Sequence, residues 1–134
     1  MLEVKDVKKT FDTEEILQGI DFRVDKGEVV AIIGPSGSGK TTLLRCISFL
    51  EKADQGTIIF DDYTHDMTNV SKSDIRNIRM QMGFVFQSFN LFNNMTAFEN
   101  VMEGLVTARK MDKAQATDIA LKVLDKVGML DRKD

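Results

Sequence analysis

The first third of the chain alternates hydrophobic and polar positions in the way that β-strands do. Ile20, Phe22 and Val24 alternate with charged residues, which predicts a strand with one buried face and one wet face. Apolar positions within residues 2–7 predict a short strand before it, which ends near residues 8–10. Residues 29–33 are apolar at every position, which is typical of a strand buried on both faces of a parallel sheet.

The middle of the chain mixes short strand and helix patterns. Residues 56–60 predict another short strand, followed by a polar loop over residues 61–70. Ser73 or Asp74 is placed to cap a helix that runs to about Gln81. Residues 83–86 then predict a strand that ends at Gln87.

The last third predicts consecutive helices. Thr96-x-x-Glu99 is a capping box, and apolar residues recur at helical spacing after it. Asp112 is expected to cap a final helix that Gly128 ends. This order of elements predicts an α/β fold whose helical portion begins after about residue 90.

Composition narrows the functional classes. The formal net charge is −3, so no nucleic-acid partner is expected, and the single cysteine excludes an internal disulfide. Charges interrupt the first residues where a signal peptide needs an apolar run, and no stretch approaches about 18 uninterrupted apolar residues. We therefore expect a cytoplasmic protein.

The candidate chemistry lies in the loop Gly34-Pro-Ser-Gly-Ser-Gly-Lys-Thr41, which fits the phosphate-binding pattern G-x-x-x-x-G-K-[S/T]. Its glycines allow successive backbone N–H groups to point toward a bound anion. The helix expected from Lys40 to about Glu51 also attracts the anion through the positive end of its dipole. Lys40 would reach the β- and γ-phosphates, while the Thr41 hydroxyl would hold Mg²⁺. A simple glycine-rich turn is the alternative. The residues expected to contact the nucleotide phosphates are Gly34, Ser36, Gly37, Ser38, Gly39, Lys40, Thr41 and Thr42.

The surroundings of this loop resemble the ATP-binding subunits of ABC transporters. Residues 29–51, with the continuation Leu-Arg-Cys-Ile, are most similar to the branch that serves polar amino acid uptake. Residues 17–24 resemble the antiparallel strand before the P-loop, and residues 83–92 resemble the Q-loop. The resemblance implies a P-loop NTPase core with an antiparallel β subdomain over residues 1–90. It also implies the beginning of a helical subdomain over residues 91–134.

The resemblance also implies roles for residues outside the loop. Gln87 would contact Mg²⁺ and the attacking water, although a polar residue that merely ends a strand is the alternative. Phe11 would stack on adenine, with Ile16 as a further apolar contact, unless Phe11 is simply a core residue of a small sheet. ATP and Mg²⁺ are the implied cofactors.

Asp61 and Asp62 follow an apolar run and admit two interpretations. They could be the acids of a Walker B strand, which would suit a soluble P-loop kinase or GTPase. Alternatively, Gly56 and Tyr63 on either side favour a hairpin of the antiparallel subdomain. His65 and Cys46 are interpreted as structural residues.

The family's signature sequence, its Asp-Glu after an apolar strand and its switch histidine are missing from these residues. We therefore expect an N-terminal piece of a longer subunit, truncated before the signature, that binds nucleotide without turning it over. Residues 29–33 would then expose an apolar edge. The implied partners are transmembrane permease subunits, a second ATP-binding subunit and, indirectly, an extracellular or periplasmic substrate-binding protein. The subunit would lie on the inner face of the cell membrane.

Overall fold

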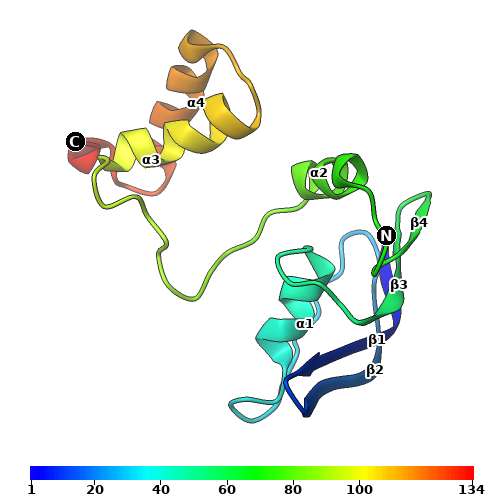
Figure 1. Ribbon diagram of the computed structural model, residues 1–134. Coiled ribbons are helices and arrows are strands. Elements are labelled where there is room, and N and C mark those ends of the chain that lie inside the picture. Colours follow the sequence, from blue (N-terminus) through cyan, green and yellow to red (C-terminus); the bar gives the residue numbers. More distant parts are fainter. The chain divides into compact units, whose positions relative to one another are not determined.

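A computed structural model describes residues 1–134 of the chain. The chain divides into two compact units, Met1–Phe84 and Val85–Asp134 (Figure 1). The first unit contains a β-sheet with two helices, and the second contains only helices. None of the helices is both long and apolar enough to cross a lipid bilayer.

The first unit is built on a four-stranded antiparallel sheet with the order β2-β1-β3-β4. Its strands are β1 (Leu2–Phe11), β2 (Glu14–Val24), β3 (Gln55–Phe60) and β4 (Tyr63–Asp66). The strands expected near residues 2–10, 20–24 and 56–60 are thus confirmed, and β2 is longer than the alternating pattern indicated. The antiparallel part of the expected fold is present.

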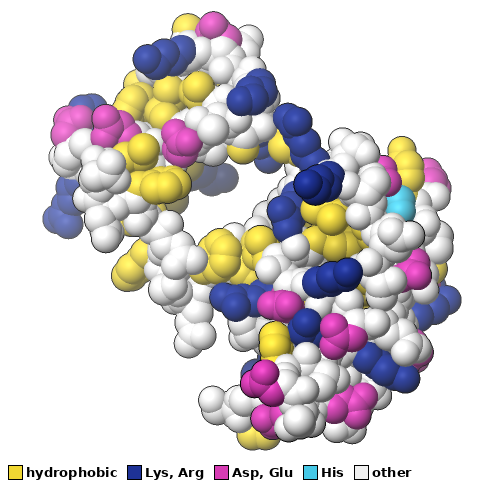
Figure 2. Space-filling view, in the orientation of Figure 1, with side chains coloured by type: hydrophobic (Ala, Val, Ile, Leu, Met, Phe, Trp, Pro, Cys, Tyr) yellow, Lys and Arg dark blue, Asp and Glu magenta, His cyan; other side chains and the backbone are white.

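The strand expected at residues 29–33 is not formed, so that prediction is wrong for this chain. Val29 and Ile33 are 97% and 92% exposed, and residues 83–86 likewise form no strand. A strand needs a neighbour to pair its N–H and C=O groups, and the four strands of the sheet pair only with one another. The parallel sheet of a P-loop core is therefore not assembled. Exposed hydrophobic side chains gather in patches on both units (Figure 2).

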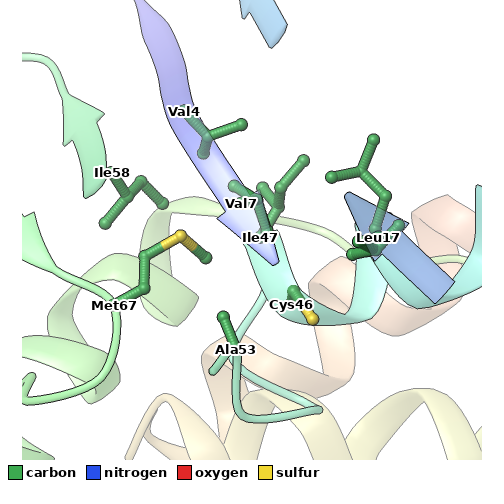
Figure 3. Packing of buried hydrophobic residues seen from close by; sticks show 9 residues of the cluster. Val4, Val7, Leu17, Cys46, Ile47, Ala53, Ile58 and Met67 are labelled. Atoms are coloured by element: carbon green, nitrogen blue, oxygen red, sulfur yellow. The ribbon is translucent and has the colours of Figure 1, made fainter. Parts of the chain in front are cut away.

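The hydrophobic core of the first unit lies between this sheet and α1 (Lys40–Ile47), which packs against β2 (Figure 3). Val4 and Val7 of β1 and Ile58 of β3 are fully buried there together with Cys46 of α1. The cluster consists of Val4, Val7, Leu17, Leu43, Cys46, Ile47, Ala53, Ile58 and Met67. Because α1 follows the glycine-rich loop directly, this core fixes the helix that begins at Lys40.

α1 is shorter than the sequence predicted, since it ends at Ile47 rather than near Glu51. The Ser48 hydroxyl donates to the carbonyl oxygen of Leu44 at 2.9 Å, and Phe49 takes a left-handed conformation with φ of 55°. The backbone N–H groups of Leu50 and Glu51 then both turn back to the carbonyl of Arg45. These contacts end the helix in a compact turn.

The segment after β3 also differs from the expected polar loop, because it contains β4. The next helix, α2 (Lys72–Gln81), begins one or two residues before the predicted caps. Its N-cap is Ser71, whose hydroxyl oxygen accepts from the backbone N–H of Asp74 at 3.1 Å. Ser73 and Asp74 lie inside the helix, so the predicted cap residues were wrong by a few positions.

The second unit contains α3 (Ala97–Glu103), the π-helical turn η1 (Gly104–Ala108), α4 (Lys113–Lys126) and the 3₁₀ turn η2 (Leu130–Arg132). The predicted capping box is confirmed. The Thr96 hydroxyl accepts from the Glu99 N–H at 3.2 Å, and the Glu99 carboxylate accepts from the Thr96 N–H at 2.8 Å. Asp112 caps α4 as expected. Ala116, Ala120 and Leu124 form the buried face of α4.

Candidate nucleotide-binding site

The glycine-rich loop enters α1 through a glycine that no other residue can replace without strain. Gly39 is the N-cap of α1 and has φ of 86°, in the left-handed region. A Cβ built on Gly39 would lie 3.0 Å from the carbonyl oxygen of Ile16 and 3.0 Å from a methyl carbon of Leu17. The loop therefore lies directly against β2, which sets where the helix begins.

The loop curls around the side chain of Lys40. The Lys40 ammonium donates to the carbonyl oxygens of Gly34 and Pro35 at 2.9 and 2.6 Å, and to the Ser38 hydroxyl at 3.3 Å. A Cβ on Gly34 would lie only 2.8 Å from the Ser38 hydroxyl oxygen, so the two ends of the loop approach closely. The positive charge is held at the centre of the loop by three oxygen atoms.

The electrostatics of this site fit an anion with several charges. No acidic residue lies in the first turn of α1, so no carboxylate there opposes the positive end of the helix. The free N–H groups of that turn and the Lys40 ammonium are the donors that phosphate oxygens bind. Thr41 adds an exposed hydroxyl oxygen, a donor of the hard type that Mg²⁺ prefers. The donor set therefore fits a magnesium–nucleotide triphosphate. The remaining hydroxyl groups of the loop belong to Ser36 and Thr42.

Phe11 and Ile16 lie near the β1–β2 turn, on the strands that precede the loop. Ile16 is half-buried, and its side chain would lie 3.0 Å from a Cβ on Gly39, so the structure brings it to the loop. Phe11 is the last residue of β1, pairs with Glu14 and is 43% exposed. The ammonium of Lys9 lies over its ring, 4.9 Å from the centroid.

An ionic cluster that no sequence pattern indicated lies beside Phe11. The Lys9 ammonium lies 3.2 Å from a carboxylate oxygen of Glu51 and 3.3 Å from one of Asp54. Burial lowers the pKa of Lys9, but its hydrogen bonds to Glu51 and Asp54 outweigh burial, and its pKa is raised overall. The Thr10 N–H, and secondarily Lys9, lower the pKa of Asp54. The alternation of Val7, Lys9 and Phe11 was the one available signal that Lys9 faces inward.

Gln87 lies in the second unit, Val85–Asp134, while the glycine-rich loop lies in the first. Its side chain is exposed and the residue forms a bend rather than the end of a strand. The role of Gln87 toward the nucleotide therefore stays a prediction.

Asp61 and Asp62 form the turn of the β3–β4 hairpin, as the hairpin interpretation predicted. Phe60 pairs with Tyr63 across this turn, and Asp61 has a left-handed φ of 51°. The Asp61 carboxylate accepts from the amino group of Met1 at 2.7 Å. Because β3 runs antiparallel to β1, this is not the parallel core strand that a Walker B site requires.

Cys46 and His65 also take structural positions. Burial, with a smaller contribution from Glu51, raises the pKa of the Cys46 thiol to about 11, so the thiolate is scarce at neutral pH. His65 stacks on Tyr63 with ring centroids 6.4 Å apart. No group of three or more His, Cys, Asp and Glu side chains is arranged to hold a metal ion by itself.

Known proteins similar to this chain match it over a region that includes the glycine-rich loop and most of the antiparallel sheet. Residues 17–134 match the model of the ABC transporter family. The chain belongs to this family.

Three curated relatives illustrate the similarity in sequence. The chain is 48% identical to the L-cystine import ATP-binding protein TcyC of Bacillus subtilis over all of its length and 55% of the relative. It is 47% identical to the glutamine transport ATP-binding protein GlnQ of Escherichia coli, with 98% of the chain and 54% of the relative covered. The histidine/lysine/arginine/ornithine transport ATP-binding protein HisP of Escherichia coli is 39% identical, with 98% and 54% covered.

A solved structure of MJ0796, described as a bacterial ABC transporter cassette in dimeric form, superposes with a TM-score of 0.81 at 33% identity. The superposed region covers 93% of this chain and 56% of the MJ0796 chain. A second structure of MJ0796, described as a post-hydrolysis state bound to ADP and Pi, gives a TM-score of 0.80. The chain spans about half the length of the curated relatives it matches.

Proposed function

We propose that this chain binds Mg-ATP as part of the ATP-binding subunit of an ABC importer for polar amino acids. The observation that carries the proposal is the loop of residues 34–40, which holds the Lys40 ammonium at the start of α1. The names of the relatives support the transport role, since they are import or transport ATP-binding proteins for cystine, glutamine and basic amino acids.

Each residue of the site has a proposed role. Lys40 and the N–H groups of the loop bind the β- and γ-phosphates, and the Thr41 hydroxyl is a ligand of Mg²⁺. The metal, when bound, neutralises charge on the phosphate oxygens. Phe11 stacks on the adenine ring, and Ile16 adds an apolar contact beside the loop. Gln87 contacts Mg²⁺ and the water that attacks the γ-phosphate.

We further propose that these 134 residues bind ATP but do not turn it over. No sequence Ser-Gly-Gly-Gln is present, and no apolar run ends in Asp-Glu. The pair Asp61-Asp62 lies in a hairpin turn, where neither carboxylate ends a parallel strand. Hydrolysis depends on a positioned water and on charge stabilisation from both sides of the phosphate, so we expect little acceleration from this half alone.

The assembly in which the chain works is part of the same proposal. Residues 1–90 supply the nucleotide site, and residues 91–134 begin the helical subdomain. A second ATP-binding subunit covers the nucleotide, and permease subunits transmit the motion, at the cytoplasmic face of the cell membrane. A substrate-binding protein on the other side of the membrane delivers the cargo.

Titration of the chain with Mg-ATP, followed by calorimetry, tests the nucleotide site. Lys40→Ala should weaken binding by about 10- to 100-fold, because it removes a charge-assisted contact to phosphate. Lys26→Ala removes the same charge from an exposed position outside the loop and should leave binding unchanged. Equal affinity of wild type and Lys40→Ala would contradict the proposal, and a preference for GTP over ATP would favour a GTPase instead.

Phosphate release in the presence of Mg-ATP tests the second part. We expect no steady release above background under conditions that saturate binding. Steady release that disappears in Lys40→Ala would show that the chain is a complete ATPase and would overturn the proposed lack of turnover.

A further inference from the structure

Lys9 is a buried charge at the end of β1 with no role in the phosphate site. The residue is only 8% exposed, although lysine is rarely buried without a partner. Its ammonium is held by Glu51 and Asp54 at 3.2 and 3.3 Å. Burying a charge is costly unless it is paired with good geometry. Lys9 is paired only where its ammonium reaches both carboxylates, so the two ion pairs restrict the position of its side chain.

The same cluster joins the end of β1 to the turn that follows α1. Glu51 belongs to the compact turn after α1, where its N–H bonds to Arg45. Asp54 also accepts from the backbone N–H of Thr10 at 2.7 Å, and its own N–H donates to the carbonyl of Lys8 at 2.9 Å. The backbone on both sides of Lys9 is therefore tied to the segment that follows the phosphate-binding helix.

The fixed ammonium also lies over the ring of Phe11, 4.9 Å from its centroid. This is within the range of a cation–π contact, which stabilises one orientation of the ring. Phe11 keeps 43% of its surface exposed. The ring is therefore in contact with Lys9 and is also accessible to a ligand.

We propose that Lys9 is a positioning residue for the nucleotide base: held by Glu51 and Asp54, it fixes the Phe11 ring so that the opposite face receives adenine. This inference rests on the proposed stacking role of Phe11. It adds that the base-binding surface is set by a cluster anchored to the turn after α1. An aromatic ring that is already ordered loses less conformational entropy when a base stacks on it.

The test separates the base from the phosphates with two probes, Mg-ATP and inorganic tripolyphosphate with Mg²⁺. The dissociation constant for tripolyphosphate divided by that for Mg-ATP is a ratio that measures how much the base contributes to binding. Phe11→Ala should reduce this ratio by about 5- to 100-fold, the range expected for base stacking on an aromatic ring. Lys9→Met should reduce it by about 2- to 30-fold, the range for a cation–π contact, and should leave tripolyphosphate affinity almost unchanged.

Matched variants distinguish positioning from a general loss of charge or fold. Lys8→Met removes a neighbouring lysine that pairs with Asp6 instead, so the ratio should stay at the wild-type value. Lys9→Arg should restore the ratio, because a guanidinium can pair with carboxylates and lie over an aromatic ring. Adding Lys9→Met to Phe11→Ala should change the ratio no further.

Circular dichroism shows which variants fold. If Lys9→Met does not fold, Glu51→Gln takes its place: it keeps Lys9 but loosens its hold, and it should lower the ratio in the same direction. Two outcomes would overturn the positioning role of Lys9 but not stacking on Phe11. One is an equal loss of affinity for ATP and tripolyphosphate in Lys9→Met. The other is an unchanged ratio in Lys9→Met beside a reduced ratio in Phe11→Ala. An unchanged ratio in Phe11→Ala would overturn stacking on Phe11 and this inference together, while the Lys40→Ala titration independently decides whether the loop binds nucleotide.

Discussion

At the scale of single residues, Gly39 is constrained in two independent ways. Its φ of 86° lies in the left-handed region, and its α-carbon faces the backbone of β2 with no room for a methyl group. The first constraint concerns the backbone alone, and the second concerns packing. A glycine elsewhere in the same unit, Gly27, shares only the first, because a Cβ there would meet no atom within 4 Å.

We predict that Gly39→Ala destabilises the first unit more than Gly27→Ala does. Gly27→Ala should cost about 1–2 kcal/mol for the left-handed conformation. Gly39→Ala should exceed this cost, since its neighbours in β2 must also move, and it should weaken Mg-ATP binding because the loop shifts. Urea unfolding gives both free energies, and calorimetry gives the affinities. Equal destabilisation by the two substitutions would show that the approach to Ile16 is not tight.

The loop residues could be predicted from the sequence, and the Lys9 cluster could not. Gly34 to Thr42 are contiguous, and their chemistry depends on local backbone geometry that the order of residues specifies directly. Lys9 and Asp54 are separated by 45 positions. Their contact exists only because β1 pairs with β3, and no pattern along the chain shows which carboxylates reach which lysine.

At the scale of elements, helix starts were predicted where one residue could cap and missed where several could. Thr96 and Asp112 are the residues expected, and both cap their helices. Before α2, Ser71, Ser73 and Asp74 all suit an N-cap, and Ser71 takes the position because its oxygen reaches the Asp74 N–H. The apolar run at residues 29–33 has strand composition, but a strand also needs a neighbour, which composition does not specify.

We predict that Thr96→Ala weakens the second unit by about 1 kcal/mol, because it removes the hydroxyl that accepts from the Glu99 N–H. Thr107→Ala, an exposed threonine of η1, is the matched control and should stay within about 0.5 kcal/mol of wild type. Native-state hydrogen exchange of the first-turn amides of α3 reports the difference. Identical protection in both variants would mean that the capping box contributes nothing to the helix.

At the scale of the whole molecule, the exposed apolar surface is the main departure from an ordinary globular protein. The core of the first unit lies on the antiparallel sheet and α1, and Ile32 packs against it, but Val29 and Ile33 stay almost fully exposed. An extended apolar segment with unpaired backbone groups is a template for pairing with another chain. A second copy of this chain carries the same segment, so self-association needs no further partner.

We therefore predict that the chain associates with itself as its concentration rises, and that residues 29–33 mediate the contact. Replacing Val29 and Ile33 together with lysine should shift the population toward monomer, since charges on an edge oppose strand pairing. The matched control replaces Val123 and Val127, which are 45% and 64% exposed at the end of α4, with lysine. A helix has already paired its backbone groups internally, so this control adds the same charge without removing a pairing edge.

Light scattering coupled to size-exclusion chromatography over a range of loading concentrations gives the mass of each variant. The wild type and the α4 control should show the same rise in mass, and the double variant at residues 29 and 33 should show little. A wild type that stays monomeric at high concentration would contradict the prediction. If both double variants abolished association equally, charge alone would be responsible, and the exposed segment would have no particular role in pairing.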